Sequence, residues 1–395
     1  MTRLALGDFA LVTSLGTGGP ATLAALRAGR SGLAPCTFDT LPLAAHAGEV
    51  PGLDQPLPPA FAAFDCRNNR LAAQALALED FRATVDAAKT RYGAARIGVF
   101  VGTSTSGILQ SETAYRRRGA DGRLPADLDY AHTHNTYALG HFVRDMLGLR
   151  GPAFVVSTAC AATSKVFASA ARMIEAGICD AAIIGGADTL CATTLLGFHA
   201  LGVMAEGPCR PFDTARNGIS IGEAAGFVLL EKPGPQHGPD TLLLLGTGES
   251  SDAYHMSSPH PEGAGARLAM ARALADSGLA AADIGYVNLH GTATLVGDAA
   301  EDKAISSLFG TATPCSSSKG FTGHTLGASG IVSAAICALA LRHDFLPGSP
   351  HTSTRDPAFT SNYLLAGQEG RIGYAMSNAF GFGGVNCSLV LGRAA

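Results

Sequence analysis

The alternation of short apolar runs with helix-forming stretches most strongly constrains the fold of this chain of 395 residues. Strands that alternate with helices are typical of an α/β fold with mostly parallel strands. Helices are predicted over 161–176 and 264–277, because Gly177 and Gly278 stand where a helix stop is expected. The predicted strands are 96–102, 153–158, 181–186, 226–231, 241–246, 284–289 and 387–392.

A segment dense in proline and glycine, EKPGPQHGPD at 231–240, divides the chain into two parts. Each part runs strand, helix, strand and ends in a β-rich stretch, AAIIGGAD…GFVLLE in the first and GYAMSN…CSLVLG in the second. This pattern indicates an internal duplication with halves 1–235 and 236–395, although any α/β protein shows some self-similarity.

The composition excludes several classes of protein. Hydrophobic residues are 47% and charged residues 15% of the chain, which favours a large core, and a net charge of -4 argues against nucleic-acid binding. The nine cysteines show no CxxC pair and no zinc spacing, so we expect reduced thiols, a cytoplasmic protein and no metal. Asp8 interrupts any signal peptide, and the apolar helix Ile331 to Leu341 is too short to span a bilayer. It is expected to be buried, without membrane insertion.

Cys160 lies where a predicted strand meets a predicted helix, in the stretch FVVSTACAATSKVFASAARM at 154–173. Unpaired N–H groups at a helix start stabilise negative charge, so we expect the helix to lower the pKa of this thiol and make it nucleophilic. The same amides would bind the oxyanion formed when the thiol attacks a carbonyl group. The alternative is a buried structural cysteine, since free cysteine is among the most buried residue types.

Histidines and a lysine occupy two later segments. His290 ends the apolar run of NLHGTATLVGDAAEDKA, where a strand enters a loop and a cleft is expected, but a core or turn histidine is the alternative. Lys319 and His324 lie in SSSKGFTGHTLGASG, a glycine-rich turn ahead of the apolar helix. Such a helix start could also bind an anion. The pattern is not GxxxxGK[ST], however, so a nucleotide P-loop is not expected.

Two phenylalanines, Phe380 and Phe382, stand between glycines in SNAFGFGGVN near the end of the chain. Flexible glycines around bulky apolar side chains favour a mobile gate over an apolar pocket. The alternative is a β-bulge or turn that buries two core aromatic rings.

In this order the motifs resemble those of the elongating β-ketoacyl-acyl-carrier-protein synthases, the type I/II condensing enzymes of fatty acid and polyketide assembly. The resemblance rests on STACAATS, HGTAT, SSSKGFTGH and NAFGFGG, and it runs from RIGVFVGTSTSG to the end of the chain. It implies an α/β fold of the thiolase type, with two pseudo-duplicated halves in five α/β/α/β/α layers. It also implies a tight dimer, formed either with a second copy or with a ketosynthase-like subunit.

The resemblance implies roles for five residues. Cys160 would take an acyl chain from an acyl carrier protein as a thioester, and its N–H and that of Phe382 would form the oxyanion hole. His290 and His324 would bind the thioester carbonyl of the malonyl-loaded carrier as CO2 leaves. Lys319 would orient His324.

Further residues complete the implied site. Thr292 and Thr294 would bind the phosphopantetheine arm that the carrier protein delivers, and no permanently bound cofactor is expected. Phe380, with the second phenylalanine of its loop, would gate the pocket. Thr105 and Phe198 would line the acyl pocket, and a threonine where a larger aliphatic residue is common suggests an unusual acyl group, such as that of an aryl polyene.

The chain departs from the family pattern at three other positions. Ser333 replaces a glutamate on the helix after GHTLGA, so Lys319 is expected to be less well supported, although Glu301 could compensate. Val385 replaces a threonine, and Asn217 replaces an acidic residue.

Carrier proteins are acidic, so basic residues are candidates for docking one. We assign this role to Arg67, Arg70 and Arg123, together with the run Arg116 to Arg118, which on its own is equally compatible with a solvated surface.

The expected activity is decarboxylative Claisen condensation by an acyltransferase, a 3-oxoacyl-[acyl-carrier-protein] synthase. Two alternatives stay open. One is a non-catalytic partner of the same fold that determines chain length, but such partners usually lack the nucleophilic cysteine. The other is a hydrolase that uses Cys160 and His290 as a dyad.

Overall fold

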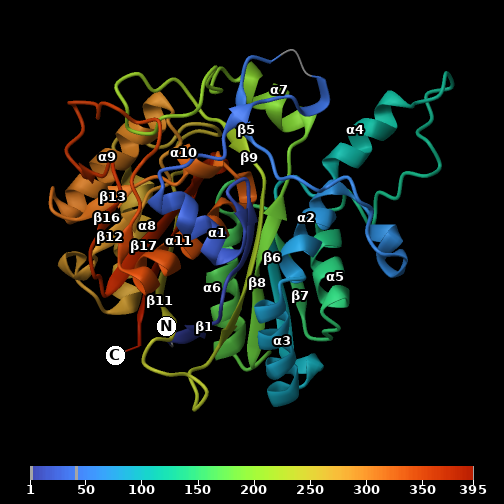
Figure 1. Ribbon diagram of the computed structural model, residues 1–395, viewed down its shortest axis with the longest axis horizontal. Helices are drawn as coiled ribbons and strands as arrows, with labels where there is room; N and C mark the ends of the chain where they lie inside the picture. Colours follow the sequence, from blue (N-terminus) through green and yellow to red (C-terminus); the bar gives the residue numbers. More distant parts are fainter. Residues whose placement is uncertain (1–2, 41–42, 395) are drawn as a thin grey trace.

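A 13-stranded mixed sheet runs through residues 3–40 and 43–394, which the computed structural model describes (Figure 1). Met1 and Ala395, the outer bounds of the two predicted halves, lie outside the described residues. The strands are β1 Leu4–Leu6, β2 Ala10–Thr13, β3 Gly16–Thr17, β6 Ile97–Gly102, β7 Ala153–Val156, β8 Ala181–Asp188, β10 Ala224–Glu231, β11 Leu242–Ser251, β12 Tyr286–Asn288, β13 Pro314–Ser316, β15 Asn362–Tyr363, β17 Tyr374–Gly381 and β18 Val385–Arg393.

The strand order repeats within this sheet. The first part of the chain forms the order β7, β6, β8, β10, β1, and the second part forms β13, β12, β17, β18, β11. In the first part, β6 is parallel to both β7 and β8, and in the second part β12 is likewise parallel to both β13 and β17. The strands that follow, β10 and β1 in the first part and β18 and β11 in the second, are antiparallel to their neighbours. The halves meet where β1 pairs with β11. This repeat agrees with the predicted duplication, while the boundary at 235/236, in the loop between β10 and β11, stays a prediction.

The expectation of mostly parallel strands is wrong. Only the 3₁₀ turn Phe382–Gly384 connects β17 to β18, and a connection this short can join only antiparallel neighbours. In the first half, β10 is antiparallel to β8, β1 and β2. The sheet is therefore parallel towards its two ends and antiparallel through its middle.

Helices form layers on the outer sides of the two parts of this sheet and between them (Figure 1). The helices α6 and α11 pack on each other and lie between the two halves, each in contact with strands of both. The helices α2, α3 and α5 cover the outer side of the first half, and α8 and α9 cover that of the second. The five predicted layers are therefore present. The helix bounds are α1 Gly18–Arg27, α2 Arg67–Leu76, α3 Glu79–Tyr92, α4 Ile108–Arg116, α5 Tyr137–Met146, α6 Ala162–Glu175, α7 Ala192–Ala200, α8 Ala264–Ser277, α9 Leu295–Phe309, α10 Lys319–Thr322 and α11 Ser329–His343.

Short strands outside the main sheet form two small sheets of their own. The strand β5 pairs with β4 and β9 in one, and β14 pairs with β16 in the other. Their bounds are β4 Ala34–Pro35, β5 His46–Gly48, β9 Ile221–Gly222, β14 Phe345–Leu346 and β16 Gln368–Glu369.

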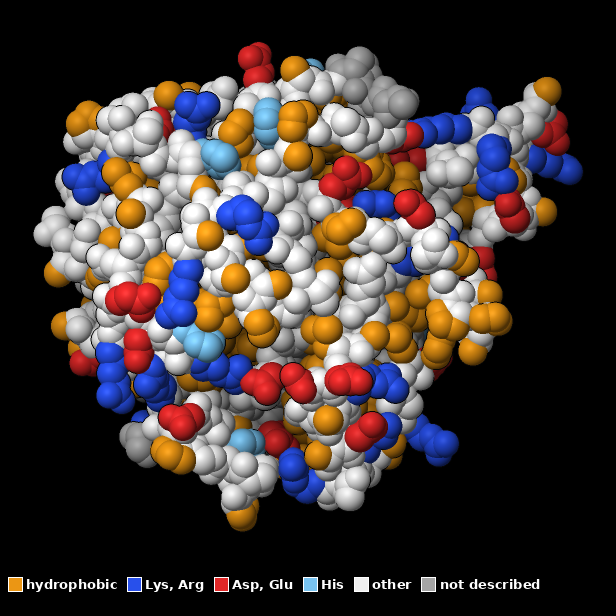
Figure 2. All heavy atoms as spheres, viewed as in Figure 1, with side chains coloured by type: hydrophobic (Ala, Val, Ile, Leu, Met, Phe, Trp, Pro, Cys, Tyr) orange, Lys and Arg blue, Asp and Glu red, His pale blue; other side chains and the backbone are white. Residues whose placement is uncertain are grey.

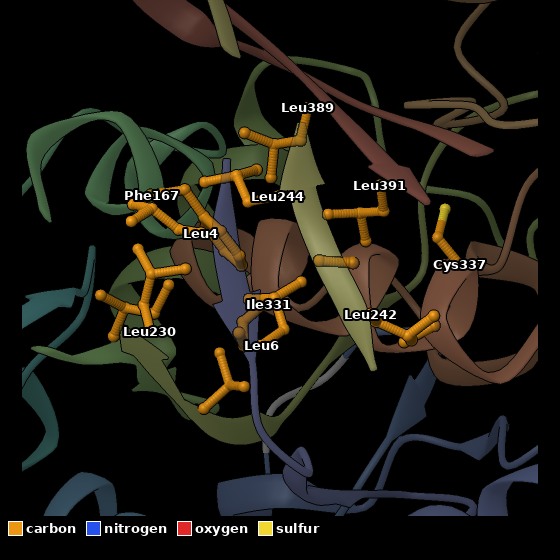
Figure 3. Close-up of a cluster of buried hydrophobic side chains, with 14 of the residues drawn as sticks. Leu4, Leu6, Phe167, Leu230, Leu242, Leu244, Ile331, Cys337, Leu389 and Leu391 are labelled. Atoms are coloured by element: carbon orange, nitrogen blue, oxygen red, sulfur yellow. The ribbon is translucent and has the colours of Figure 1, made fainter. Parts of the chain in front are cut away.

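The central core joins the two halves (Figure 3). Phe167 of α6 and Ile331 of α11 are fully buried there among leucines of β1, β10, β11 and β18. Both helices are rich in alanine on the faces that contact the sheets, which lets the three inner layers approach closely. Neither half could therefore bury its inner sheet face without the other.

The helix α11 is longer than the apolar run that predicted it. Together with the turn before it, the segment Leu326–His343 has 18 residues and a mean hydropathy of 1.4, long and apolar enough to cross a membrane by composition alone. However, 83% of this segment is buried inside the protein. A helix that is apolar on all sides is what the middle layer of this fold requires.

We expect truncation of the central core to destabilise the whole protein. Phe167→Ala removes a fully buried ring and should lower the free energy of unfolding by about 3–5 kcal/mol, because the cavity cannot close between rigid layers. Leu268→Ala on the exposed side of α8 is the matched control and should stay within about 0.5 kcal/mol of the unchanged protein. Chemical denaturation followed by circular dichroism measures both. Equal midpoints for the two variants would contradict the assigned core.

Candidate active site

The segments that carry the predicted catalytic residues all follow the carboxyl ends of parallel strands. Cys160 follows β7, His290 follows β12, Lys319 follows β13, and Phe380 and Phe382 lie at the end of β17. In open α/β sheets the carboxyl ends of parallel strands form the usual binding crevice. The duplication brings two such crevices together, since the nucleophile comes from the first half and the other groups from the second.

Cys160 occupies a tight turn directly before α6. The residue before it, Ala159, has a φ of 48°, a left-handed conformation that alanine rarely adopts. The strained turn aims the sulfur at the imidazole of His324, and Sγ lies 2.9 Å from Nε2. Backbone N–H groups of Phe382 and of Cys160 itself hydrogen-bond to the same sulfur. Both predicted oxyanion-hole donors therefore converge on the thiol.

The prediction that the helix start lowers the pKa of Cys160 is wrong for the resting site. Burial raises this pKa to about 11, and it outweighs the opposing effects of the Lys319 charge and the Phe382 N–H group. Removal from water disfavours the thiolate more than one cation and two amides favour it. The resting nucleophile is therefore a thiol, and it must lose its proton as it reacts.

The two histidines lie edge to face beside this thiol. The ring centroids of His290 and His324 are 5.4 Å apart with an interplanar angle of 87°. Burial lowers the pKa of both well below the ordinary value, and the nearby Lys319 charge lowers both further. Both imidazoles are therefore neutral at neutral pH. Among the described residues, Nδ1 of each ring is buried without a hydrogen-bond partner, so no contact at Nδ1 fixes either tautomer.

Lys319 does not contact the residue that it was predicted to orient. Its Nζ donates a hydrogen bond to the backbone carbonyl of His290, while His324 is held through its backbone, whose N–H donates to Ser220 at 2.7 Å and whose carbonyl accepts from Gly222 at 3.0 Å. The ammonium acts on the His324 ring through its charge. Burial lowers the pKa of Lys319 itself.

Buried carboxylates support the second-half loops in the absence of the family's usual glutamate. Ser333, which replaces it, is buried in the middle of α11. Glu301 accepts hydrogen bonds from the N–H groups of His290 (2.8 Å) and Gly291 (2.6 Å), and burial raises its pKa to about 7. Its charge raises the pKa of Lys319, as the predicted compensation requires.

The sequence analysis missed Asp298. It accepts from the N–H groups of Phe212 (2.8 Å) and Ala293 (3.0 Å), and burial raises its pKa to about 6. Its spacing of three residues before Glu301 on α9 was the available signal, because residues at i and i+3 share a helix face.

A cavity of about 290 Å³ connects these groups with the surface. Phe198 and Phe382 lie across it with ring centroids 5.6 Å apart, and Phe380 lies 5.9 Å from the ring of His290. Further predicted residues on its wall are Cys160, His324, Thr292, Thr294 and Asn217. The two threonine hydroxyls hydrogen-bond to each other at 3.0 Å. The cavity is thus narrowed by aromatic rings next to the nucleophile and bounded by hydroxyls further out.

Thr105 is not among the residues that line this cavity. Its hydroxyl donates to the buried carboxylate of Asp188 at 2.9 Å, and its backbone N–H donates to the same oxygen at 2.9 Å. The argument from Thr105 to an unusual acyl group therefore loses its basis here. Asp188 was likewise not predicted from the sequence. The available signal was its position as the one acid that ends the apolar strand AAIIGGAD, which is typical of a buried polar contact.

The predicted docking arginines differ in what they contact. Arg67 binds the buried carboxylate of Glu223 through Nε (2.6 Å) and Nη2 (2.8 Å), and its side chain is only 14% exposed. Arg70 forms a similar two-point pair with Asp65 at 2.7 and 2.6 Å. Both guanidinium groups are therefore committed to contacts within the protein, and a docking role for them finds no support in the structure. Arg123, by contrast, is 88% exposed.

Comparison with known protein families gives two adjoining matches. The description "Beta-ketoacyl synthase, N-terminal domain" matches residues 9–234, and "Beta-ketoacyl synthase, C-terminal domain" matches residues 243–353. The 3-oxoacyl-[acyl-carrier-protein] synthase 2 of Vibrio cholerae serotype O1 is 33% identical over 417 residues, which cover 99% of each chain.

Solved structures of the same fold cover the whole chain. The ketosynthase ApeO in complex with its chain length factor ApeC from Xenorhabdus doucetiae gives a match of 37% identity and a TM-score of 0.90, over 100% of this chain and 98% of the matched chain. A β-ketoacyl synthase from Burkholderia phymatum STM815 is 29% identical with a TM-score of 0.89, and both chains are covered fully. Together with the geometry of the site, these matches show that the chain belongs to the β-ketoacyl synthase family of thiolase-fold condensing enzymes.

Proposed function

We propose that this protein loads an acyl chain from an acyl carrier protein onto Cys160 and extends it by decarboxylative Claisen condensation with a malonyl-loaded carrier. One observation carries the proposal: a thiol faces an imidazole at 2.9 Å and two backbone N–H groups, at the inner end of a cavity. Nucleophile, proton acceptor and oxyanion donors are thus present in the geometry that acyl transfer requires.

Acyl transfer follows from the neutral resting state. Sγ of Cys160 attacks the carrier thioester as its proton moves to Nε2 of His324, and the N–H groups of Cys160 and Phe382 receive the negative charge that develops on the carbonyl oxygen. Collapse of the tetrahedral intermediate expels the carrier thiolate, which takes the proton from His324. Each such N–H donor lowers the barrier by about 2.7–4 kcal/mol.

Condensation uses the second imidazole. The malonyl carboxylate leaves as CO2, and the negative charge that remains forms an enolate whose oxygen is held by N–H donors of His290 and His324. Nδ1 of His324 has no hydrogen-bond partner among the described residues, so no contact there opposes a change of tautomer between the step in which Nε2 accepts a proton and the step in which it donates one. The enolate carbon then attacks the acyl group on Cys160 and releases its thiolate, and a proton taken up from solvent restores the thiol.

The structure argues against the two alternatives. A subunit that only determines chain length would not need the full set of thiol, two imidazoles and ammonium around one cavity. The hydrolase alternative assigned the proton acceptor to His290, but the imidazole at hydrogen-bonding distance from Cys160 is that of His324. We propose that the product of this protein enters fatty acid, polyketide or aryl polyene synthesis.

We propose a dimer as well, either of two copies or with a ketosynthase-like subunit, and the ApeO complex with its chain length factor supports the second form. The strand β7 ends the large sheet, so its outer edge offers unpaired backbone groups. Phe154 on this strand is 46% exposed although it stacks on the buried Phe100. A partner strand would cover both features.

Removal of the nucleophile is expected to abolish the reaction. Cys160→Ala should give no acyl adduct by intact mass after incubation with acyl-carrier protein, and no extended product with malonyl-carrier protein. Cys315→Ala, at another buried cysteine, is the matched control and should still acylate. Persistence of a covalent adduct on Cys160→Ala would contradict its role, and release of free acid alone by the unchanged protein would favour a hydrolase.

The protonation states predict the pH dependence of the thiol. With a pKa of about 11, the reaction of Cys160 with iodoacetamide should keep rising above pH 9. Lys319→Met removes the charge that most favours the thiolate, so the pKa of Cys160 should rise. The alkylation rate at pH 8 should then fall about tenfold for each unit by which this pKa rises. Lys303→Met, at an exposed lysine paired with Glu262, should leave the rate unchanged. Peptide mapping of residue 160 measures the rates, and a plateau below pH 9 would refute the assignment.

We propose that Arg123 helps to dock the acidic carrier. Basic and acidic side chains both lie on the segment that projects from the body, which comprises α4 and the loop after it (Figure 2). Arg123 on this loop is 88% exposed. Arg123→Glu should raise the KM for acyl-carrier protein and leave kcat unchanged, because rim charges act mainly on association. The same reversal at Arg371, an exposed residue before β17, is the control. An unchanged KM for Arg123→Glu would show that the carrier docks elsewhere.

A further inference from the structure

Asp188, at the end of β8, is a buried carboxylate that none of the steps above uses. It is 0% exposed, and its oxygens accept hydrogen bonds from Thr103 Oγ1 (2.6 Å), Ser104 N (2.8 Å), Thr105 N and Oγ1 (both 2.9 Å) and Gly327 N (2.6 Å). Three of these residues belong to the loop after β6, and the fourth belongs to the loop that carries His324. Asp188 therefore binds segments of both halves.

No cation balances this charge. Across residues 3–40 and 43–394, no lysine, arginine or histidine forms an ion pair with Asp188, and burial raises its pKa. A buried charge without a counter-ion is unfavourable unless hydrogen bonds satisfy it fully. The five donors meet that condition, so the carboxylate is held rigidly by dipoles of the two loops.

The first connection leads to the imidazole. Both polar backbone groups of Gly327 are held by side chains of the first half, its N–H by Asp188 and its carbonyl by Thr163 Oγ1 at 2.6 Å. A Cβ atom at position 327 would lie 2.7 Å from the carboxylate oxygen, so only glycine permits this close approach. His324 lies three residues earlier in the same loop, between this anchor and its own backbone contacts with Ser220 and Gly222.

The second connection leads to the nucleophile. Ser104, whose N–H is bound by Asp188, donates its hydroxyl hydrogen bond to the carbonyl of Ala159 at 3.2 Å, directly before Cys160. The carbonyl of Cys160 accepts from Ser329 Oγ at 3.0 Å, on the other side of the same junction. The thiol and the imidazole are thus tied to one carboxylate through short chains of hydrogen bonds.

We propose that Asp188 is a positioning residue for acyl transfer, whose carboxylate holds the loops of Cys160 and His324 at the separation over which the thiol proton moves. This inference rests on the proposed function. Two charges act on the pKa of Cys160, Lys319 from α10, which lowers it, and Asp188 from β8, which raises it, while the neutral His324 faces the sulfur at 2.9 Å. Among them Asp188 alone carries negative charge, and this charge opposes the thiolate.

Asp188→Asn tests the proposal with two readouts. The amide keeps the size of the side chain but loses the charge and turns two N–H groups towards N–H donors. The kcat of acyl transfer should fall about 10²-fold through displacement of the imidazole, while the KM for acyl-carrier protein stays unchanged. The alkylation profile of Cys160 with iodoacetamide should shift to lower pH, because the charge that opposes the thiolate is gone.

A second variant keeps the charge. Thr103→Val removes the shorter of the two hydroxyl donors to the carboxylate, together with the acceptor for the Ser106 N–H group, and leaves the other four donors in place. The kcat should therefore fall by less, and the alkylation profile should keep its position. This variant also serves if Asp188→Asn does not fold. Asp213→Asn is the matched control, since Asp213 is a buried carboxylate that bridges two loops, accepting from the N–H groups of Ala215 (2.8 Å) and Ser353 (2.7 Å). In Asp213→Asn, the pH profile of Cys160 alkylation and the kcat per folded molecule should match those of the unchanged protein.

Two results would overturn the proposal. One is an unchanged kcat and profile in Asp188→Asn. The other is a loss of kcat in Asp188→Asn and Asp213→Asn alike that follows only the folded fraction, which would assign Asp188 a structural role. Alkylation of Cys160 needs no carrier substrate, so it tests Asp188 even if the unchanged protein neither acylates nor condenses. A protein without either activity would contradict the proposed function and not the role of Asp188.

Discussion

Removal from water controls the chemistry of this site. The thiol, both imidazoles, the ammonium of Lys319 and the carboxylate of Glu301 are all buried, and burial is the largest influence on the pKa of each. Burial favours the neutral form of every one of these groups. In such surroundings a thiol next to a neutral imidazole is more stable than a thiolate next to an imidazolium. The thiol and the two imidazoles therefore become charged only as a substrate reacts, at the places where N–H groups already point.

The burial that sets these pKa values depends on the duplication. Each half supplies one part of the large sheet and one central helix, and the halves pack together through α6 and α11. Cys160 comes from the first half, and His290, Lys319 and His324 come from the second. A separated half would expose an apolar sheet face and would leave the nucleophile without its proton acceptor. Folding and catalysis therefore depend on the same interface.

Much of this was predictable from local patterns. The helix expected over 264–277 has the observed bounds of α8. The strands predicted over 96–102, 153–158 and 181–186 begin and end within two residues of β6, β7 and β8. Glycine stops and apolar runs act over a few residues, so the sequence carries them directly. Cys160 and His290 were singled out because each closes an apolar run, and the roles predicted for them came from the resemblance to the family.

Contacts between distant segments were not predictable in the same way. Arg67 looks like a surface cation until the fold brings Glu223 to it, 156 residues away. Lys319 was assigned to His324, five residues along the chain, but the fold places the carbonyl of His290 beside its ammonium. The pKa of Cys160 was misjudged for a related reason. The helix start is visible in the sequence, whereas the extent of burial depends on every layer of the fold.

The replacement at Ser333 shows how such a site tolerates the loss of a charge. Lys319 needs nearby negative charge to remain an ammonium in apolar surroundings, and Glu301 and Asp298 both supply it from α9. A further carboxylate on α11 would have to be desolvated as well, in a helix that is buried along most of its length. A serine there avoids that penalty and leaves the hydrogen bond from Lys319 to the His290 carbonyl in place. The positive field at the two imidazoles therefore depends on one lysine and on the two acids of a single helix.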